Sequence, residues 1–420
     1  MSGVAGKRVV LGVTGSIAAF KAAQLCSTLV QAGAEVDVIL TDAAQQFLTP
    51  LTFQSLTRRP AYVDLYAFTP DLSSAHVTLG AEADVLVVCP ASATTLARLA
   101  RGSAEDMLSC TALASSAPLV IAPAMNVNMW RHPATQENVR TLEARGAIRV
   151  GPVVGHLAEG ISAMGRLAPL EDVIGATRLA LGRRAPWIGR RVVVSAGGTQ
   201  EAIDPVRYVG NHSSGKMGYA IAEAARDRGA EVTLISGASA LPDPWRMEVR
   251  RATSAREMAA AVLGACDGAD ALIMAAAVAD FRPETVAAQK IKKSSPDAAL
   301  DLHLVQNPDV LQAVHRAYGD SLVKVGFAAE SRDVLAEAGR KLAAKGLHLI
   351  CANDVTEAGS GFGTDTNRVT ILARDGTRED LPLLRKAEVA ERLLDRVETL
   401  FSRSGQASPA SPGAAPLAAR

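Results

Sequence analysis

The chain has 420 residues, 48% of them hydrophobic, which is enough apolar material for about two globular domains of ordinary size. Its 44 Lys and Arg residues nearly balance 43 Asp and Glu residues, so no net charge would attract nucleic acid or an anionic membrane. The five Cys residues lack a C-x-x-C spacing, which argues against a zinc site or a disulfide framework. The start lacks the apolar core of a signal peptide, and no apolar run approaches about 18 residues, so we expect a cytoplasmic protein without membrane contact.

The first 40 residues predict a strand, a helix and a second strand. Residues 7–12 (KRVVLG) and 34–40 (AEVDVIL) are β-branched runs typical of buried strands. The sequence between them has helical spacing and a stop at Gly33, with apolar positions at Ile17, Phe20, Leu25 and Leu29. This order is typical of a parallel sheet, although GVTGS lacks the G-x-G-x-x-G spacing of a dinucleotide site.

The second half of the chain repeats pieces of the first in the same order. Residues 31–40 (QAGAEVDVIL) match 227–236 (DRGAEVTLIS), and 83–92 (ADVLVVCPAS) match 269–278 (ADALIMAAAV). The pairs predict two α/β units of similar wiring, arising either from duplication or from the common demands of buried parallel strands.

We therefore predict an α/β fold with two Rossmann-like domains. The seam around Gly182–Gly189 divides the chain into domains at residues 1–185 and 186–402. Residues 403–420 are small, polar and Pro-rich, and we expect them to be disordered.

Ligands of open parallel sheets bind beyond the carboxyl ends of the strands, and four segments of the first half converge there. They are residues 12–17, Thr41-Asp42, residues 89–95 and residues 122–130. Asn126 could orient a carboxylate or an amide, or it could simply cap a tight turn. His76, at the start of an expected helix, could be functional or a surface cap.

The long loop from Ser195 to Gly218 organises the second half. It joins a strand to a helix, yet it far exceeds the usual βα connection of about 2–6 residues. Its Gly, Ser and basic residues are suited to phosphate at a helix N-terminus. We therefore interpret it as a nucleotide-phosphate and reaction loop, whose polar members are Asp204, Arg207, Asn211, His212, Ser213, Ser214 and Lys216.

Further polar clusters follow in the second half. Asp280 ends an apolar strand, Lys290–Lys293 (KIKK) could neutralise a triphosphate or form an exposed loop, and Asn307 and Asp309 are both candidate helix caps. Lys341 and Lys345 are one helical turn apart. No GxxxxGK[ST] loop or kinase signature is present in the sequence, so common ATPase classes are disfavoured.

The first half resembles the flavin-dependent cysteine decarboxylases, in particular phosphopantothenoylcysteine decarboxylase. The resemblance covers residues 7–178 and rests on GVTGSIAAFK, AHVTL with His76, CPASATTLARLARGSAEDMLS and PAMNVNMW. It implies an N-terminal flavoprotein fold that binds FMN between the subunits of a trimer. The implied FMN contacts are Gly15, Ser16, Ile17, Thr41, Ser92, Thr94 and Thr95.

The resemblance also implies a reaction. The thiol of the substrate's cysteine is oxidised by the flavin, carbon dioxide is lost, and the product is protonated and reduced. His76 would be the acid/base group and Asn126 would hold the substrate carboxylate.

The first half departs from the family pattern in its covering loop and its flavin loop. Residues 157–167 read LAEGISAMGRL, with Glu159 where the family has a proton-donating Cys and Ala163 where it has Gly. Thr94 replaces an Asn of the flavin loop. A Glu can donate this proton if burial raises its pKa, and on that hypothesis Glu159 is a candidate catalytic residue.

The second half, over residues 189–400, resembles the bacterial, CTP-using phosphopantothenate–cysteine ligases. DPVRYVGNHSSGKMG, AAVADFRP, KIKK, NPDVL, GFAAE and ANDV match in order. The resemblance implies a doubly wound ligase domain that activates 4′-phosphopantothenate with CTP as an acyl-cytidylate, which L-cysteine then attacks. Asn211 would bind this intermediate and Lys290 would contact phosphate.

Mg²⁺ is expected to accompany the triphosphate. The implied CTP contacts are Met274, Ala275, Ala276, Asp280, Lys290, Pro308, Asp309, Val310, Leu311, Phe327, Lys341 and Lys345. Family ligase domains dimerise, so trimeric and dimeric contacts in one chain imply a homo-dodecamer.

Together the two halves would carry out consecutive steps of coenzyme A synthesis. One alternative is an active ligase fused to a flavin-binding domain that no longer completes decarboxylation, as the Glu159 substitution allows. Another is a nucleotide-binding regulatory protein without catalysis, which the combination of His76, Asn211 and Lys290 disfavours.

Overall fold

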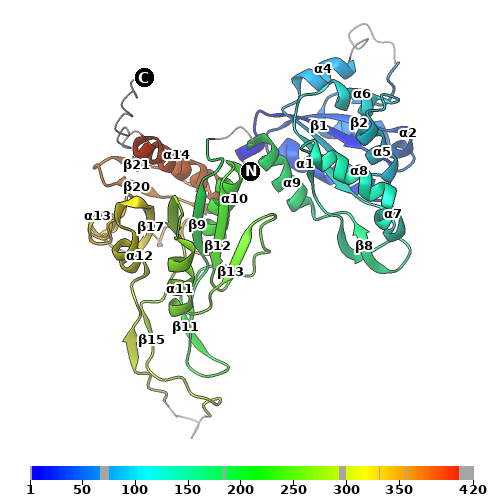
Figure 1. Ribbon diagram of the computed structural model, residues 1–420. Coiled ribbons are helices and arrows are strands. Elements are labelled where there is room, and N and C mark those ends of the chain that lie inside the picture. Colours follow the sequence, from blue (N-terminus) through cyan, green and yellow to red (C-terminus); the bar gives the residue numbers. More distant parts are fainter. Residues whose placement is uncertain are drawn as a thin grey trace, which may run out of the picture. The chain divides into compact units, whose positions relative to one another are not determined.

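The computed structural model describes residues 2–66, 75–182, 186–292, 299–330, 332–354, 356–357 and 359–405. The chain divides into two compact units, and the division falls between Ile188 and Gly189. The first unit also includes the short segments 226–229 and 244–246. Each unit contains its own sheet, as Figure 1 shows.

The first unit is a six-stranded parallel sheet with strand order β3-β2-β1-β4-β5-β6. Its strands are β1 (Arg8–Val13), β2 (Glu35–Leu40), β3 (Ala61–Tyr62), β4 (Val85–Ala91), β5 (Leu119–Pro123) and β6 (Ile148–Arg149). Its helices are α1 (Ala19–Gln31), α2 (Asp42–Gln45), α3 (Pro50–Thr57), α4 (Ala75–Glu82), α5 (Ala93–Arg101), α6 (Met107–Ala114), α7 (Val127–Arg131), α8 (Pro133–Ala144) and α9 (Leu170–Leu181). A hairpin of β7 (Val153–His156) and β8 (Ser162–Arg166) completes it.

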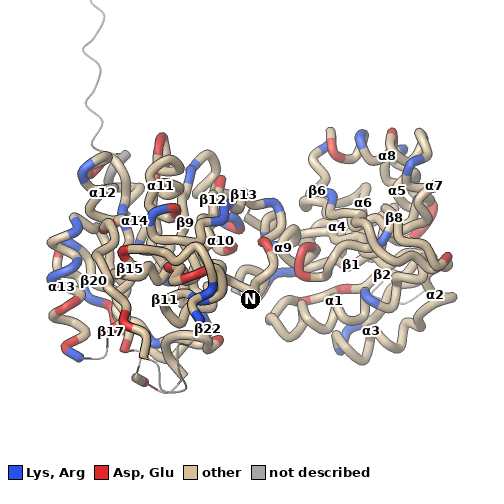
Figure 2. Tube along the Cα trace, turned by 90° about the horizontal axis from the view of Figure 1, so that it is seen from below, with Lys and Arg blue, Asp and Glu red and all other residues tan. Residues whose placement is uncertain are grey.

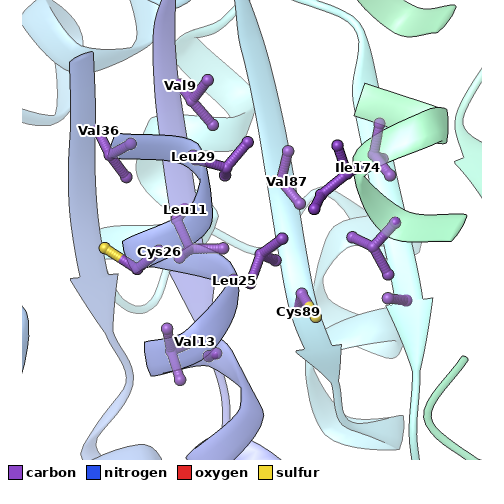
Figure 3. Close-up of a cluster of buried hydrophobic side chains, with 14 of the residues drawn as sticks. Val9, Leu11, Val13, Leu25, Cys26, Leu29, Val36, Val87, Cys89 and Ile174 are labelled. Atoms are coloured by element: carbon purple, nitrogen blue, oxygen red, sulfur yellow. The ribbon is translucent and has the colours of Figure 1, made fainter. Parts of the chain in front are cut away.

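Both faces of this sheet are buried, because β1 alternates its side chains between two cores. Val9, Leu11 and Val13 join a core that includes residues of α1, α3 and α9. Figure 3 shows Leu25 and Leu29 of α1 among these strand residues. Val10 belongs to a second core with residues of α4, α5, α6 and α8.

The helix predicted after β1 has a narrower apolar face than its spacing indicated. Leu25 and Leu29 are fully buried, whereas Ile17 and Phe20 are each 60% exposed. Ile17 lies before α1 begins, and Phe20 lies in its first turn. Gly33 follows the helix with φ +86°, as expected of a stop signal.

The second unit repeats the wiring of the first. Its eight-stranded sheet has the order β13-β12-β9-β14-β17-β18-β20-β21, in which all neighbours up to β18 are parallel and the last two strands are antiparallel. The strands are β9 (Arg191–Ala196), β12 (Glu231–Ser236), β13 (Glu248–Arg251), β14 (Ala271–Met274), β17 (Val323–Glu330), β18 (Leu349–Asp354), β20 (Thr370–Ala373) and β21 (Arg378–Asp380). The helices are α10 (Lys216–Asp227), α11 (Ala255–Ala265), α12 (Val310–Tyr318), α13 (Val334–Ala344) and α14 (Lys386–Gly405).

Three two-stranded ribbons extend this unit. They are β10 (Gln200–Ala202) with β11 (Tyr208–Gly210), β15 (Phe281–Pro283) with β16 (Leu304–Gln306), and β19 (Thr366–Asn367) with β22 (Leu384–Arg385). In Figure 1 the β11 and β15 ribbons extend away from the sheet. Figure 2 shows acidic and basic positions dispersed along the elements of each unit, in line with the balanced composition.

The α/β prediction with two Rossmann-like domains is confirmed. The sequence pairs found earlier occupy corresponding strands, since β2 and β12 flank β1 and β9, and β4 and β14 flank them on the other side. The predicted disordered tail begins too early, because α14 continues to Gly405. Residues 406–420 lie outside the described part of the chain.

The buried position of Leu25 gives a test of the first core. Leu25→Ala should lower the free energy of unfolding of this unit by about 2–5 kcal/mol, because a fully buried side chain leaves a cavity. Hydrogen exchange of β1 amides in increasing urea would measure the change. Gln24→Ala, on the exposed side of the same helix, should change it by less than about 0.5 kcal/mol. Equal effects of both substitutions would contradict this core assignment.

Candidate active sites

A cavity of about 550 Å³ lies in the second unit, at the carboxyl ends of its parallel strands. It is lined by residues 210–218, 274–280 and 306–311, and by Phe327, Ala329, Lys341, Lys345, Asn353, Gly361, Phe362, Asn367 and Lys386. All the residues expected around CTP line this cavity except Lys290, which is exposed and outside its lining. Asn211 lies on its wall with the serines of the long loop.

The N-terminus of α10 forms one wall of this cavity. Gly218, in its first turn, has no room for a side chain, because a Cβ atom would lie 2.5 Å from the Cβ of Ala196. Gly215, just before the helix, has φ +82°, which favours glycine. The close approach of α10 to β9 brings free backbone N–H groups to the cavity wall, where they are suited to bind phosphate.

Three lysines on the cavity wall hold carboxylate partners. Lys341 Nζ lies 2.5 Å from Glu330 Oε1, and Lys345 Nζ lies 3.2 Å from Asp309 Oδ2. Lys216 Nζ lies 2.7 Å from Asp365 Oδ1 and lowers the pKa of that carboxyl. The cavity therefore combines ammonium groups with a helix N-terminus, which is the chemistry that a polyphosphate requires.

The two predicted caps near α12 have different roles. Asp309 caps the helix and accepts a hydrogen bond from Gln312 N at 3.1 Å. Asn307 does not cap it. Its buried side chain donates to the Ala279 carbonyl at 2.9 Å and accepts from Arg282 at 3.1 Å, so it fixes the chain beside Asp280.

The long loop proves to be two structures rather than one reaction loop. Its first part forms the β10–β11 ribbon, where Arg207 donates to Asp204 and the backbone N–H groups of Val206 and Ile291 donate to the same carboxyl. These donors hold the pKa of the buried Asp204 well below its usual range. Asp204 and Arg207 therefore stabilise the turn of the ribbon, and only residues from Gly210 onward line the cavity.

Sequence reasoning missed the wall that Gly361, Phe362, Asn367 and Lys386 contribute. The signal for the first three is the sequence GSGFGTDTN at residues 359–367, a Gly-rich segment that follows β18 and thus emerges at the same edge of the sheet. Lys386 carried no such signal, because it begins α14 and comes near only through folding.

In the first unit, hydrogen bonds join the segments expected around FMN. Thr14 Oγ1 donates to the Pro90 carbonyl at 2.6 Å and accepts from Ser92 N at 2.9 Å. Ser16 Oγ donates to the Ala124 carbonyl at 3.4 Å. The loops after β1, β4 and β5 therefore meet at one edge of the sheet. Thr41, after β2, caps α2 at the same edge.

These loops offer a suitable donor set for a flavin nucleotide. Gly15 allows the β1 loop to lie against α2, since a Cβ atom there would be 2.5 Å from the Cβ of Ala43. Ser92 caps α5 and accepts from Thr95 N at 3.3 Å, while the side chain of Thr94 is exposed. Hydroxyl groups and the free N–H groups at the start of α5 fit the phosphate of FMN.

Asn126 and Glu159 contact each other directly. Asn126 Nδ2 donates to Glu159 Oε1 at 2.9 Å, and Asn126 Oδ1 accepts from Asn128 N at 2.8 Å. Glu159 lies in the exposed turn of the β7–β8 hairpin, which is held to the Asn126 loop by a Met125 N to Gly165 O bond of 3.0 Å. The structure therefore brings together the two residues that the sequence placed in the substrate site.

The expectation that burial raises the pKa of Glu159 is wrong for this chain. Glu159 is exposed, and the hydrogen bond from Asn126 lowers its pKa by favouring the carboxylate. In this arrangement Glu159 is an anion bound to the amide that is expected to hold the substrate carboxylate. It is thus not poised to donate a proton.

His76 is half-buried at the second position of α4. Residues 67–74, immediately before this helix, lie outside the described part of the chain. The neighbours Ala75 and Leu79 are buried in the core on this side of the sheet and fix the helix there.

Within the described ranges, His, Cys, Asp and Glu side chains form no group of three or more that could hold a metal ion. Among the same residues, none of the helices is both long and apolar enough to cross a membrane.

The Asn126–Glu159 contact predicts a measurable ionisation change. Asn126→Ala should raise the pKa of Glu159, because the carboxylate would lose the hydrogen bond from the amide that favours its ionised form. A ¹³C NMR pH titration of the side-chain carboxyl would measure it. Asn128→Ala, which keeps the Asn126 side chain, is the control. An unchanged pKa in Asn126→Ala would contradict the contact.

Two family models cover both units. Residues 3–180 match the family described as Flavoprotein, and residues 187–400 match the DNA/pantothenate metabolism flavoprotein C-terminal domain. Among solved structures, the chain is similar to the C-terminal domain of a coenzyme A biosynthesis bifunctional protein CoaBC. The identity is 38%, the match covers 52% of this chain and 98% of that one, and the TM-score is 0.44.

Curated relatives match nearly the whole chain. The coenzyme A biosynthesis bifunctional protein CoaBC of Vibrio cholerae serotype O1 is 44% identical over 397 residues, covering 94% of this chain and 98% of the relative. The protein of the same name from Bacillus subtilis strain 168 is 44% identical over 405 residues, covering 96% and 99%. By this extent of similarity, the chain belongs to the family of bifunctional coenzyme A biosynthesis proteins.

Proposed function

We propose that the chain joins 4′-phosphopantothenate to L-cysteine at the expense of CTP and then decarboxylates the product to 4′-phosphopantetheine. The observation that carries the proposal is the cavity of about 550 Å³, which gathers the residues expected around CTP at the N-terminus of α10. The flavin-type donor set in the first unit supports the second reaction. Residues 1–185 would form the decarboxylase domain and residues 186–402 the ligase domain.

In the ligase reaction, an oxygen of the 4′-phosphopantothenate carboxylate attacks the α-phosphorus of CTP, and pyrophosphate leaves. Lys341 and Lys345 would exchange their carboxylate partners for phosphate oxygens, and Mg²⁺ bound to the triphosphate would offset further charge. Asn211 would hold the acyl-cytidylate through its amide. The amine of cysteine then attacks the acyl carbon, CMP leaves and the amine proton is lost to solvent.

Lys290 would act from outside the cavity wall. It is exposed, and the neighbouring Ile291 is tied to Asp204 and Arg207 by backbone hydrogen bonds of 3.1 and 2.7 Å. This anchor leaves the Lys290 side chain free to reach phosphate when substrate is bound. Lys293 lies outside the described residues.

In the decarboxylase reaction, FMN would be held by Gly15, Ser16, Ile17, Thr41, Ser92, Thr94 and Thr95. The bound flavin supplies reversible two-electron oxidation of the substrate thiol. His76 would transfer protons at the reacting cysteine, and the Asn126 amide would orient its carboxylate. Because Glu159 accepts a hydrogen bond from this amide, the substrate carboxylate would have to displace it.

We propose a homo-dodecamer in the cytoplasm, with no nucleic-acid or membrane partner. Exposed apolar side chains on each unit support contacts between copies. On the first unit they include Ile17, Phe20, Phe47, Leu51, Val77, Met129, Val154 and Ile161. On the ribbons of the second unit they include Val206, Tyr208, Phe281 and Leu304.

An inactive first domain is not favoured. The relatives named as bifunctional match this chain over both units, so their similarity is not confined to the ligase half. The Glu159 difference therefore concerns how the final proton is delivered.

His76→Asn tests the decarboxylase role. It should lower carbon dioxide release by about 10²–10⁴-fold, the usual contribution of a general acid or base, while pyrophosphate release from CTP is unchanged. Trapped ¹⁴CO₂ and a pyrophosphate assay would measure the two steps. His132→Asn, an exposed helix cap that Asn can replace, is the matched control. Full decarboxylation by His76→Asn would refute the assigned role.

Asn211→Ala tests the ligase role, because it should impair ligation and leave decarboxylation unchanged. Formation of phosphopantothenoylcysteine should fall by about 10²-fold or more, since a polar group that stabilises the reacting acyl centre is lost. Decarboxylation of phosphopantothenoylcysteine supplied directly should continue at the wild-type rate. A parallel loss of both activities would mean that Asn211 supports the structure rather than the ligase site.

A further inference from the structure

The segment from Gly359 to Asn367 forms a wall that separates two cavities of the second unit. Phe362 lines the cavity of about 550 Å³ and also a neighbouring cavity of about 470 Å³. Residues 211–214 line both cavities as well, so Asn211 and Phe362 lie at their shared boundary. The side chain of Phe362 is 45% exposed.

A buried lysine holds this wall in place. Lys386 is only 6% exposed, and its Nζ donates to the carbonyls of Gly361 at 3.1 Å and Thr364 at 2.5 Å, on either side of Phe362. Burial lowers the pKa of this ammonium group, so keeping it here has an energetic cost that its two carbonyl partners offset.

Two further side chains hold the same segment. Asn367, 4% exposed, accepts from Ser360 Oγ at 2.8 Å and from Gly361 N at 3.2 Å. Lys216, at the start of α10, donates to the Gly363 carbonyl at 3.0 Å. The backbone on both sides of Phe362 is thus fixed, and the ring is presented at a defined place between the cavities.

We propose that Phe362 excludes water from the activated acyl group and that Lys386 is the positioning residue that holds it there. The inference rests on the proposed ligase function. The acyl-cytidylate would span the boundary beside Asn211. There its acyl carbon can react with the amine of cysteine, giving the amide and CMP, or with water. Water attack breaks the same acyl C–O bond, returns the carboxylic acid and CMP, and consumes CTP without product.

An apolar ring at this boundary removes one approach for water, and exclusion of water is a general means of preventing hydrolysis of reactive intermediates. Buried hydrogen bonds hold the backbone on both sides of the ring. The ring therefore stays in place and keeps that approach closed until cysteine binds. The wall thereby determines how much CTP is used per amide formed.

The test is the ratio of pyrophosphate released to amide formed by the full-length protein with 4′-phosphopantothenate, CTP, Mg²⁺ and cysteine. Wild-type protein should give a ratio near 1. If water attack is about a tenth as fast as cysteine attack in the wild type, a tenfold faster water attack in Phe362→Ala should raise the ratio to about 2. Phe362→Leu, which keeps an apolar side chain, should stay close to wild type. Leu335→Ala, an exposed apolar truncation on α13, is the control for a nonspecific effect.

Lys386→Met should raise the same ratio, and Lys386→Arg, which keeps the charge and the donors, should restore it. The matched control is Lys324→Met. Lys324 is fully buried and also donates to backbone carbonyls, those of Gly319 and Leu322, but it does not line the cavity. Lys324→Met should lower thermal stability and leave the ratio near 1.

A ratio that stays near 1 in Phe362→Ala overturns the inference while leaving the ligase function intact. An equal rise in Lys386→Met and Lys324→Met overturns the positioning role, because lost stability would then explain it. If wild-type protein releases no pyrophosphate from CTP, the ligase function itself fails and the inference fails with it.

Discussion

Parallel strands impose the constraint on which both sites depend. All the strands of a parallel sheet end at the same edge, so the loops and helix N-termini that follow them must meet there. In the first unit this edge collects the loops after β1, β2, β4 and β5, and Thr14 and Ser16 join those after β1, β4 and β5 by hydrogen bonds. In the second unit it collects the start of α10, the chain around Asp280 and the start of α12 around one cavity. The two units thus place their sites at the same edge of a similarly wired sheet, with different residues in the loops that meet there.

Buried polar side chains hold these loops in defined positions. Asn307 fixes the chain beside Asp280, Asp204 fixes the ribbon that leads to Lys290, and Lys386 fixes the segment that carries Phe362. Each is a buried polar side chain that bonds to backbone groups, which would be costly to bury unpaired. Asp280, Lys290 and Phe362 are exposed, whereas the side chains that position them are buried.

The fold was predictable because buried parallel strands leave strong local patterns. The repeated AEV-containing runs of β2 and β12 and the apolar runs of β4 and β14 predicted the strands that occupy matching places in the two sheets. The edge loops followed from this topology. The buried faces of helices were harder to predict from the sequence. Ile17 and Phe20 fit the helical spacing of α1 but lie at its start, outside the core.

The errors at the sites concern partners that are distant in sequence. Their shared loop suggested that Asp204 and Arg207 belong with Asn211, but both side chains bond to the backbone of Ile291, more than 80 residues away, which is visible only in the folded chain. Burial was expected to raise the pKa of Glu159. A hydrogen bond from Asn126, 33 residues earlier in the chain, lowers it instead. Lys386 contacts a loop 22–25 residues earlier, and no local pattern predicts such a bond.

One chain is expected to carry out both reactions in succession. The most direct measurement incubates the purified protein with 4′-phosphopantothenate, L-cysteine, CTP and Mg²⁺ and identifies the products by mass spectrometry. We expect 4′-phosphopantetheine, with CMP, pyrophosphate and carbon dioxide formed in equal amounts. Accumulation of phosphopantothenoylcysteine alone, with no carbon dioxide, would contradict the account for the first domain. Absence of any cysteine adduct would contradict it for the second.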